Sequence, residues 1–229
     1  TSTNSSIGLI YALKKILKKY INNIIISKHM NNKFFICRHC KSVMGGDEKL
    51  RELDEDGIKQ SSSLSKKISE KIDDNSIIIS SPFKRALQSL EPLSKKYKKI
   101  EILPNDNLRE INIGKSDKFT KHQIIEKMWE DKNFKVETGE SQKECYDRME
   151  IFLKDTFEIF KKEKKNIIFV THGNLIGIIL KYFFNLEFDF KMWKQISMPD
   201  FYEIVFDENY LAKDVKRDIE NIDNLFYIK

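Results

Sequence analysis

The sequence predicts a single α/β domain, built as a three-layer α/β/α sandwich around a mostly parallel β-sheet. Short apolar runs rich in β-branched and aromatic residues alternate with longer stretches of helical periodicity, which is the pattern of strands joined by crossover helices. The length of 229 residues is the second observation. It allows one domain with a sizeable core and is too short for two comfortable ones.

Five runs have the length and composition of strands, and helical stretches separate them. The strand candidates are 33–38, 76–80, 99–103, 166–171 and 201–206. The helix candidates are 54–72, 83–98, 141–164 and 174–184. Ser141 with Glu144 has the form of a helix-capping box, and Pro82 after Ser81 has the form of a helix start. Residues 115–140 have weaker periodicity and are a candidate small cap over a site.

The charge of the chain is unevenly distributed. The net charge is +6, and residues 1–46 hold eight of the 41 Lys and Arg residues but no Asp or Glu. The remaining residues therefore carry 33 basic against 35 acidic side chains. A nucleic-acid enzyme needs a basic face on its working domain, so this balance argues against nucleic acid as a substrate. Three cysteines cannot form a closed disulfide set, which favours a reducing, cytoplasmic location.

Residues 1–32 differ in character from the domain expected at 33–229. Apolar residues recur at helical spacing within 7–26, and four lysines lie in the same stretch, as in a basic amphipathic helix. These lysines interrupt the apolar run too early for a helix that crosses a membrane. Three interpretations stay open: a membrane-surface or organelle-targeting element, a helix packed on the domain, or sequence upstream of a start at Met30.

Ionisable residues follow the predicted strands directly. His39 and His172 each end an apolar run, and Arg38 makes the first of these strand ends cationic. Arg85 and Glu110 follow two further predicted strands. The carboxyl ends of parallel strands meet at one edge of a sheet, where α/β proteins bind ligands. Phosphoryl transfer through a histidine suits this set of groups, which comprises two imidazoles, guanidinium groups and a carboxylate at one edge.

The segments that carry these residues resemble the motifs of the histidine phosphatase superfamily, which contains cofactor-dependent phosphoglycerate mutase, fructose bisphosphatase and many small phosphomonoesterases. Five segments match, and they occur in the family's order. They are Arg38-His39, Ser81-Pro-Phe-Lys-Arg-Ala-Leu-Gln88, Leu108-Arg-Glu-Ile-Asn-Ile-Gly114, Gly139-Glu-Ser141 with Arg148, and Thr171-His-Gly-Asn174. The resemblance implies a phosphoglycerate mutase-like fold and a histidine phosphatase catalytic domain.

The resemblance also implies catalysis through a phosphohistidine. His39 would be the nucleophile, and an ordinary imidazole pKa of about 6.5 makes the neutral ring competent near pH 7. Arg38 and Arg85 would bind the phosphoryl oxygens with paired, charge-assisted hydrogen bonds. His172 would complete the pocket, and Glu110 would give a proton to the leaving alcohol.

Several further residues stay open as candidates. Ser42 is a candidate phosphate ligand, and Glu137 and Glu140 are rival acids within range. Cys37 and Cys40 have the spacing of a redox pair or half a zinc site, but the chain has no second pair, so we expect no metal and no cofactor. Cys40 stands where the family usually has glycine, beside the expected nucleophile, and is a candidate site of oxidation.

We therefore predict a metal-independent phosphomonoester hydrolase acting on a small phosphomonoester or a phosphoprotein. The stretch after His39 lacks the insertion that mutases carry, which disfavours the alternative of a phosphoglycerate mutase. A third alternative is a weakly catalytic member that binds a phosphorylated protein. Gly45 stands where many members have an asparagine, and the residues after Gly114 depart from the common pattern. The motifs therefore leave substrate choice and oligomeric state open.

Overall fold

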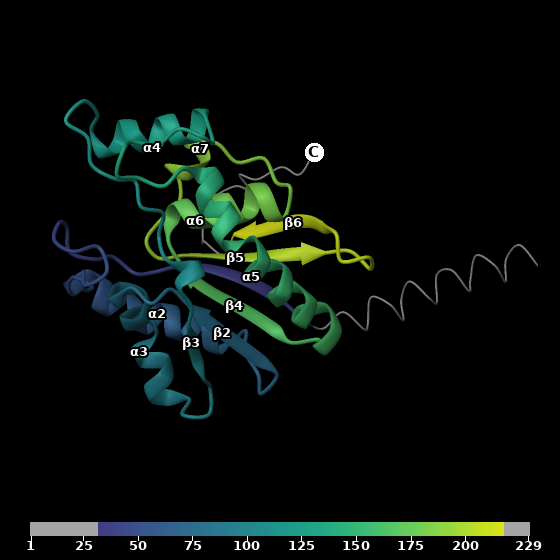
Figure 1. The fold of residues 1–229 in the computed structure, drawn as a ribbon. Helices are drawn as coiled ribbons and strands as arrows, with labels where there is room; N and C mark the ends of the chain where they lie inside the picture. Colours follow the sequence, from purple (N-terminus) through teal and green to yellow (C-terminus); the bar gives the residue numbers. More distant parts are fainter. Residues whose placement is uncertain (1–31, 218–229) are drawn as a thin grey trace, which may run out of the picture.

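The computed structural model describes residues 32–217, which form one six-stranded sheet between layers of helix (Figure 1). The predictions for the N-terminal extension, including its contact with a membrane surface, lie outside the described residues. Within residues 32–217, no helix combines the length and the apolar character needed to cross a bilayer.

The sheet has the strand order β3-β2-β4-β1-β5-β6. Its strands are β1 (Phe34–Arg38), β2 (Ser76–Ser80), β3 (Ile102–Pro104), β4 (Asn166–Thr171), β5 (Asp200–Phe206) and β6 (Ala212–Arg217). Neighbours from β3 to β1 pair in parallel, whereas β5 runs antiparallel to β1 and β6 antiparallel to β5. The prediction of a mostly parallel sheet is confirmed.

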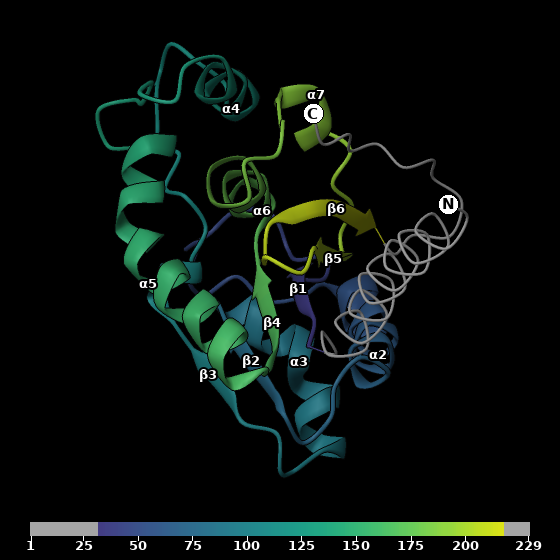
Figure 2. The ribbon, with the colours of Figure 1, turned by 90° about the vertical axis from the view of Figure 1, so that its right-hand side faces the viewer.

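Helices cover both faces of this sheet (Figure 2). The helices on the two faces are α2 (Glu55–Ser69), α3 (Lys84–Lys96), α5 (Gln142–Glu163) and α6 (Gly173–Ile178). Helices α4 (Lys121–Glu130) and α7 (Phe190–Trp193) contact each other, and α7 also contacts α6. Strand β1 is buried on both sides: Phe35 and Cys37 face the core shared with α2 and α3, while Phe34 and Ile36 face the core shared with α5 and α6. The three-layer prediction is therefore confirmed.

Aromatic packing stabilises the contact between the sheet and the layer that contains α5. The ring of Phe34 makes edge-to-face contacts, at centroid distances of 5.1–6.4 Å, with five other phenylalanines. These are Phe157, Phe160, Phe169, Phe184 and Phe206. Such pairs contribute about 0.5–1.5 kcal/mol each beyond area burial. The cluster ties α5 and the hairpin of β5 and β6 to the strand that ends at the site.

Most predicted elements are found, with boundary shifts that have physical causes. Strand β3 begins at Ile102 rather than at 99, because its register is set by pairing Ile102 with Ile78 of β2. Strand β6 was not predicted, since its residues are mostly polar and Val215 alone in it is buried. The helix expected over 174–184 ends at Ile178 and continues as the π-helical turn η2 (Ile179–Phe183).

The two predicted helix starts have different outcomes. The capping box is confirmed: Ser141 Oγ accepts from Glu144 N, and the Glu144 carboxylate accepts from Ser141 N. The start at Ser81 and Pro82 is wrong, because α3 begins at Lys84 with Phe83 as its N-cap. Ser81 instead stays beside β4, where its N–H donates to the carbonyl of Val170 at 2.8 Å.

Gly57 in the first turn of α2 permits the close approach of the chain that follows β1, and replacing it tests this packing. A Cβ atom at this position would overlap the carbonyl oxygen of Lys41. Gly57→Ala should therefore destabilise the fold by about 1–3 kcal/mol, although alanine usually stabilises a helix. Denaturant unfolding measures the change. Ser63→Ala on the exposed side of α2 is the control and should be neutral or slightly stabilising, so equal effects would contradict the packing argument.

Candidate active site

The parallel register of β1 and β4 brings the two motif histidines together. Arg38 and Thr171 are paired at the ends of these strands, and His39 N donates to the carbonyl of Thr171 at 3.0 Å. The next residues are therefore His39 and His172, whose ring centroids lie 5.0 Å apart. Both side chains are almost completely buried, with exposed fractions of 3% and 0%.

The guanidinium of Arg85, in the first turn of α3, bridges the two imidazoles. Its Nε donates to His39 Nε2 and its Nη2 to His172 Nδ1, both at 3.1 Å. A guanidinium can only donate, so both of these ring nitrogens are acceptors. The opposite nitrogens then carry the protons: His39 Nδ1 donates to the carbonyl of Cys40 at 2.6 Å, and His172 Nε2 donates to Ser81 Oγ at 2.7 Å.

The electrostatic environment keeps both imidazoles neutral. Burial lowers the pKa of His39 well below its ordinary value, and the charges of Arg85 and Arg38 lower it further. Burial likewise lowers the pKa of His172, with His39 and Arg85 as the next causes. Burial also lowers the pKa of Arg85 to about 10, which leaves it charged at pH 7. The site therefore combines neutral rings with fixed cations.

Arg38 lies against the start of α6. Its Nη1 donates to the carbonyl of Ile196 at 2.7 Å, while its Nε is buried and has no hydrogen-bond partner among residues 32–217. A Cβ at position 173 would lie 3.1 Å from Arg38 Cζ, which explains the glycine after His172. The unpartnered donor leaves Arg38 able to bind an anion at this edge.

Glu110 enters the same edge from the loop that follows the 3₁₀ turn η1 (Asp106–Leu108). Its Oε1 accepts from Ile111 N at 3.0 Å, and its Oε2 accepts from Asn174 N, in the first turn of α6, at 3.3 Å. Burial raises the pKa of Glu110, although these hydrogen bonds and the charge of Arg85 oppose the rise. Its proton is thus more easily retained than that of an exposed carboxyl.

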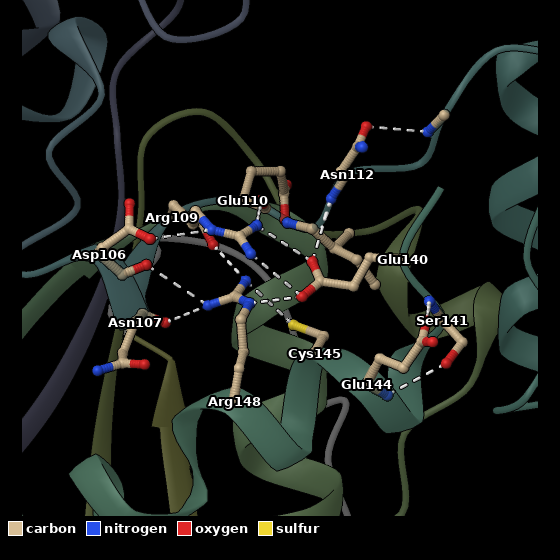
Figure 3. A network of polar contacts seen from close by, with 12 residues as sticks. Asp106, Asn107, Arg109, Glu110, Asn112, Glu140, Ser141, Glu144, Cys145 and Arg148 are labelled. Atoms are coloured by element: carbon tan, nitrogen blue, oxygen red, sulfur yellow. Dashed lines mark hydrogen bonds and ion pairs between the residues drawn. The ribbon is translucent and has the colours of Figure 1, made fainter. Parts of the chain in front are cut away.

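Arg148 of α5 holds the loop of Glu110 in place (Figure 3). It donates to the carbonyls of Asn107 at 2.7 Å and Arg109 at 2.9 Å, and to Glu140 Oε1 at 2.6 Å. Glu140 also forms an ion pair with Arg109 at 3.2 Å. The carboxylate of Glu140 is therefore engaged by two guanidinium groups, which disfavours it as a rival acid.

The other predicted candidates lie as follows. Glu137 is exposed in the loop before α5. Ser42 is 8% exposed and its backbone bridges to Leu53, so it lies at the base of the loop that follows His39. Cys37 and Cys40 are both buried in the core with α2 and α3. Across residues 32–217, no group of three or more His, Cys, Asp or Glu side chains could hold a metal ion.

Three residues at the site were missed by the sequence analysis. Ser81 was interpreted as a helix start. Its place directly after β2 could have indicated that it lies at the same edge of the sheet as the two histidines. Glu48 and Arg51 come from the loop after His39: Glu48 Oε2 lies 3.4 Å from Arg85 Nη2 and 3.2 Å from Arg51 Nη2. That loop has no periodic pattern that would indicate which of its side chains point inward.

Comparison with known proteins agrees with this geometry. The sequence profile of the histidine phosphatase superfamily (branch 1) matches residues 34–215. The match covers most of the chain, which therefore belongs to this superfamily. No curated protein matches the sequence.

Solved structures with the same fold include two phosphatases. The mycobacterial glucosyl-3-phosphoglycerate phosphatase in complex with inorganic phosphate has a TM-score of 0.62 at 17% identity, over 83% of this chain and 97% of that one. The phosphoserine phosphatase of Entamoeba histolytica in complex with 3-phosphoglyceric acid has a TM-score of 0.62 at 20% identity, over 84% and 98% of the chains. These similarities establish the phosphoglycerate mutase-like fold.

The thiols should be unreactive in the native protein, contrary to the expectation for Cys40. Burial raises the pKa of Cys40 to about 11, and it also raises those of Cys37 and Cys145. Since the thiolate is the reactive form, alkylation by iodoacetamide at pH 8 should be slow in native protein and rapid in denaturant. Mass spectrometry of timed samples measures this. Rapid labelling of native Cys40 with loss of turnover would restore the oxidation hypothesis.

Proposed function

We propose that this protein is a phosphomonoester hydrolase that forms a phosphohistidine on His39 and needs no metal ion. One observation carries the proposal: the Arg85 guanidinium lies between two neutral imidazoles, with one proton-free nitrogen of each directed at it. The proton on His39 Nδ1 is fixed by the Cys40 carbonyl, which leaves the lone pair of Nε2 for attack on phosphorus. Membership of the histidine phosphatase superfamily supports this role.

In the first step, His39 Nε2 attacks the phosphorus and the bond from phosphorus to the ester oxygen breaks. The Arg85 N–H that Nε2 accepts in the free protein transfers its hydrogen bond to a phosphoryl oxygen. Arg38 supplies its unpartnered Nε. Glu110 gives its proton to the departing oxygen, so the alcohol leaves neutral.

In the second step, water attacks the phosphohistidine and the bond from nitrogen to phosphorus breaks. Glu110, now ionised, takes the proton from water, and inorganic phosphate leaves with the Nε2 lone pair restored to His39. The preorganised donors act on the phosphoryl oxygens throughout, where electrostatic stabilisation is usually the largest catalytic effect. His172 changes its role with charge: a bound dianion favours its protonated form, which could then donate from Nδ1.

We propose a small phosphorylated molecule as the substrate, in keeping with the ligands of the two related structures. Residues 115–140 are proposed to act as a cap. Two contacts support this: Lys121, at the start of α4, lies 3.5 Å from Glu48 Oε1 in the loop beside the site, and the His122 ring contacts Phe190 and Trp193 of α7. In this role the segment would select the alcohol part of the ester.

Replacing the nucleophile tests the mechanism. His39→Ala should abolish the acid-labile phosphoenzyme and lower turnover of p-nitrophenyl phosphate at least about 10³-fold. A chelator should leave the wild-type rate unchanged, because no step uses a metal. Labelling with a ³²P substrate followed by acid and base quenching measures the intermediate. The matched control is His122→Ala, an exposed histidine, which should keep the phosphoenzyme; an unchanged phosphoenzyme in His39→Ala would refute the mechanism.

Replacing Glu110 tests the proton donor. In single turnovers, Glu110→Gln should slow phosphoenzyme formation from an alkyl phosphate by about 10²–10⁴-fold. The loss with p-nitrophenyl phosphate should be far smaller, because nitrophenolate leaves without a proton. Since the pKa of Glu110 is raised, the wild-type alkyl rate should fall as pH rises through that pKa. Glu137→Gln is the exposed control, and equal losses on both substrates would move the acid role elsewhere.

A further inference from the structure

The carboxylate of Glu48 contacts two arginines at the edge of the phosphoryl pocket. The mechanism above gives these contacts no role. Its Oε2 lies 3.2 Å from Arg51 Nη2 and 3.4 Å from Arg85 Nη2. The side chain of Arg85 is 1% exposed and that of Arg51 is 11% exposed, whereas Glu48 is half exposed. A solvent-accessible carboxylate therefore contacts two largely buried guanidinium groups at the same oxygen.

Arg51 has donor capacity that the protein itself does not use. Its Nε is buried and has no hydrogen-bond partner in the described part of the chain. Its charge is close enough to the site to lower the pKa of His39, His172 and Arg85. A guanidinium carries five N–H donors in a planar fork that fits carboxylate and phosphoryl oxygens alike. The same fork that holds Glu48 could therefore hold a phosphoryl group.

The residues just before Glu48 are exposed and have open space around them. Met44 is 86% exposed, and Gly45 and Gly46 both adopt positive φ with no neighbouring atom within 4 Å of an added Cβ. The other oxygen of Glu48, Oε1, lies 3.5 Å from Lys121 Nζ. Because half of the Glu48 side chain is exposed, water can solvate its carboxylate when it leaves the guanidinium pair, and Lys121 remains beside it as a cationic partner.

We propose that Arg51 is a further phosphoryl-binding residue and that Glu48 occupies its place in the free enzyme as an internal competitor. A phosphoryl oxygen of the substrate replaces Glu48 Oε2 between Arg51 and Arg85. A dianion interacts with this pair more strongly than a monovalent carboxylate does. This inference rests on the proposed function and deepens it, since it assigns a substrate contact outside the family motifs.

Two substitutions with opposite expected signs test the proposal. Isothermal titration with inorganic phosphate, and vanadate inhibition of p-nitrophenyl phosphate turnover, report binding at the site. Arg51→Gln should weaken phosphate binding about tenfold or more, equivalent to about 1.4 kcal/mol, and raise KM more than it lowers kcat. Glu48→Gln should tighten phosphate binding several-fold. Glu52→Gln is the matched control: this half-exposed acid of the same loop pairs with Lys84 and should leave binding unchanged.

The sign of the Glu48→Gln effect separates competition from support. If Glu48 merely positions Arg51, Glu48→Gln will weaken phosphate binding as Arg51→Gln does, and the proposal is overturned. Unchanged phosphate binding in both Glu48→Gln and Arg51→Gln also overturns the proposal. In that case, turnover of p-nitrophenyl phosphate by the wild-type protein would still support the proposed function. Arg51→Lys guards against misfolding of Arg51→Gln, because it keeps the charge, loses the fork and should still weaken binding. A wild-type protein that neither binds phosphate nor turns over would instead refute the function itself.

Discussion

The placement of a buried guanidinium between two imidazoles is the constraint on which the site depends. Arg85 is fully buried and gives hydrogen bonds to both His39 and His172. This arrangement is stable only while both rings are neutral. Protonation of a ring would convert the nitrogen that accepts from Arg85 into a donor, so that two N–H groups and two positive charges would face each other. Burial of the rings and the nearby cations lower both pKa values, so the geometry and the charge states support each other.

The same constraint explains why the site favours an anion. Three positive charges lie at the pocket, on Arg38, Arg51 and Arg85. Two carboxyl groups oppose them: Glu110, whose pKa is raised, and Glu48, which is half exposed. Buried charge without compensation is costly. A phosphoryl dianion supplies that compensation, so binding should stabilise the folded protein, by an amount that grows with the logarithm of ligand concentration once the ligand exceeds its Kd. Its negative charge would also offset the cations that depress the pKa of His172, which links binding to proton uptake.

The sequence could predict those parts of the fold and site that local pattern determines. The uninterrupted apolar runs that end at Arg38 and Thr171 predict buried parallel strands, and their ends place His39 and His172 at one edge. Strand β6 could not be predicted, because an edge strand with one buried residue, Val215, has no apolar run. The role of Ser81 needed tertiary information: its backbone pairing with β4, rather than helix capping, brings its hydroxyl to His172.

The loop after His39 shows most clearly where sequence pattern stops being informative. Glu48 and Arg51 sit in a stretch of mixed charges that is typical of a solvated turn. Their direction is decided by backbone contacts made elsewhere: Val43 N donates to the carbonyl of Glu52 at 3.0 Å, and Lys84 N donates to the carbonyl of Lys49 at 2.9 Å. These bonds fold the loop over the start of α3, where Glu48 Oε2 contacts both Arg51 and Arg85. The motifs therefore predict which groups meet at this edge of the sheet, whereas backbone contacts that no motif records decide where the side chains of this short loop lie.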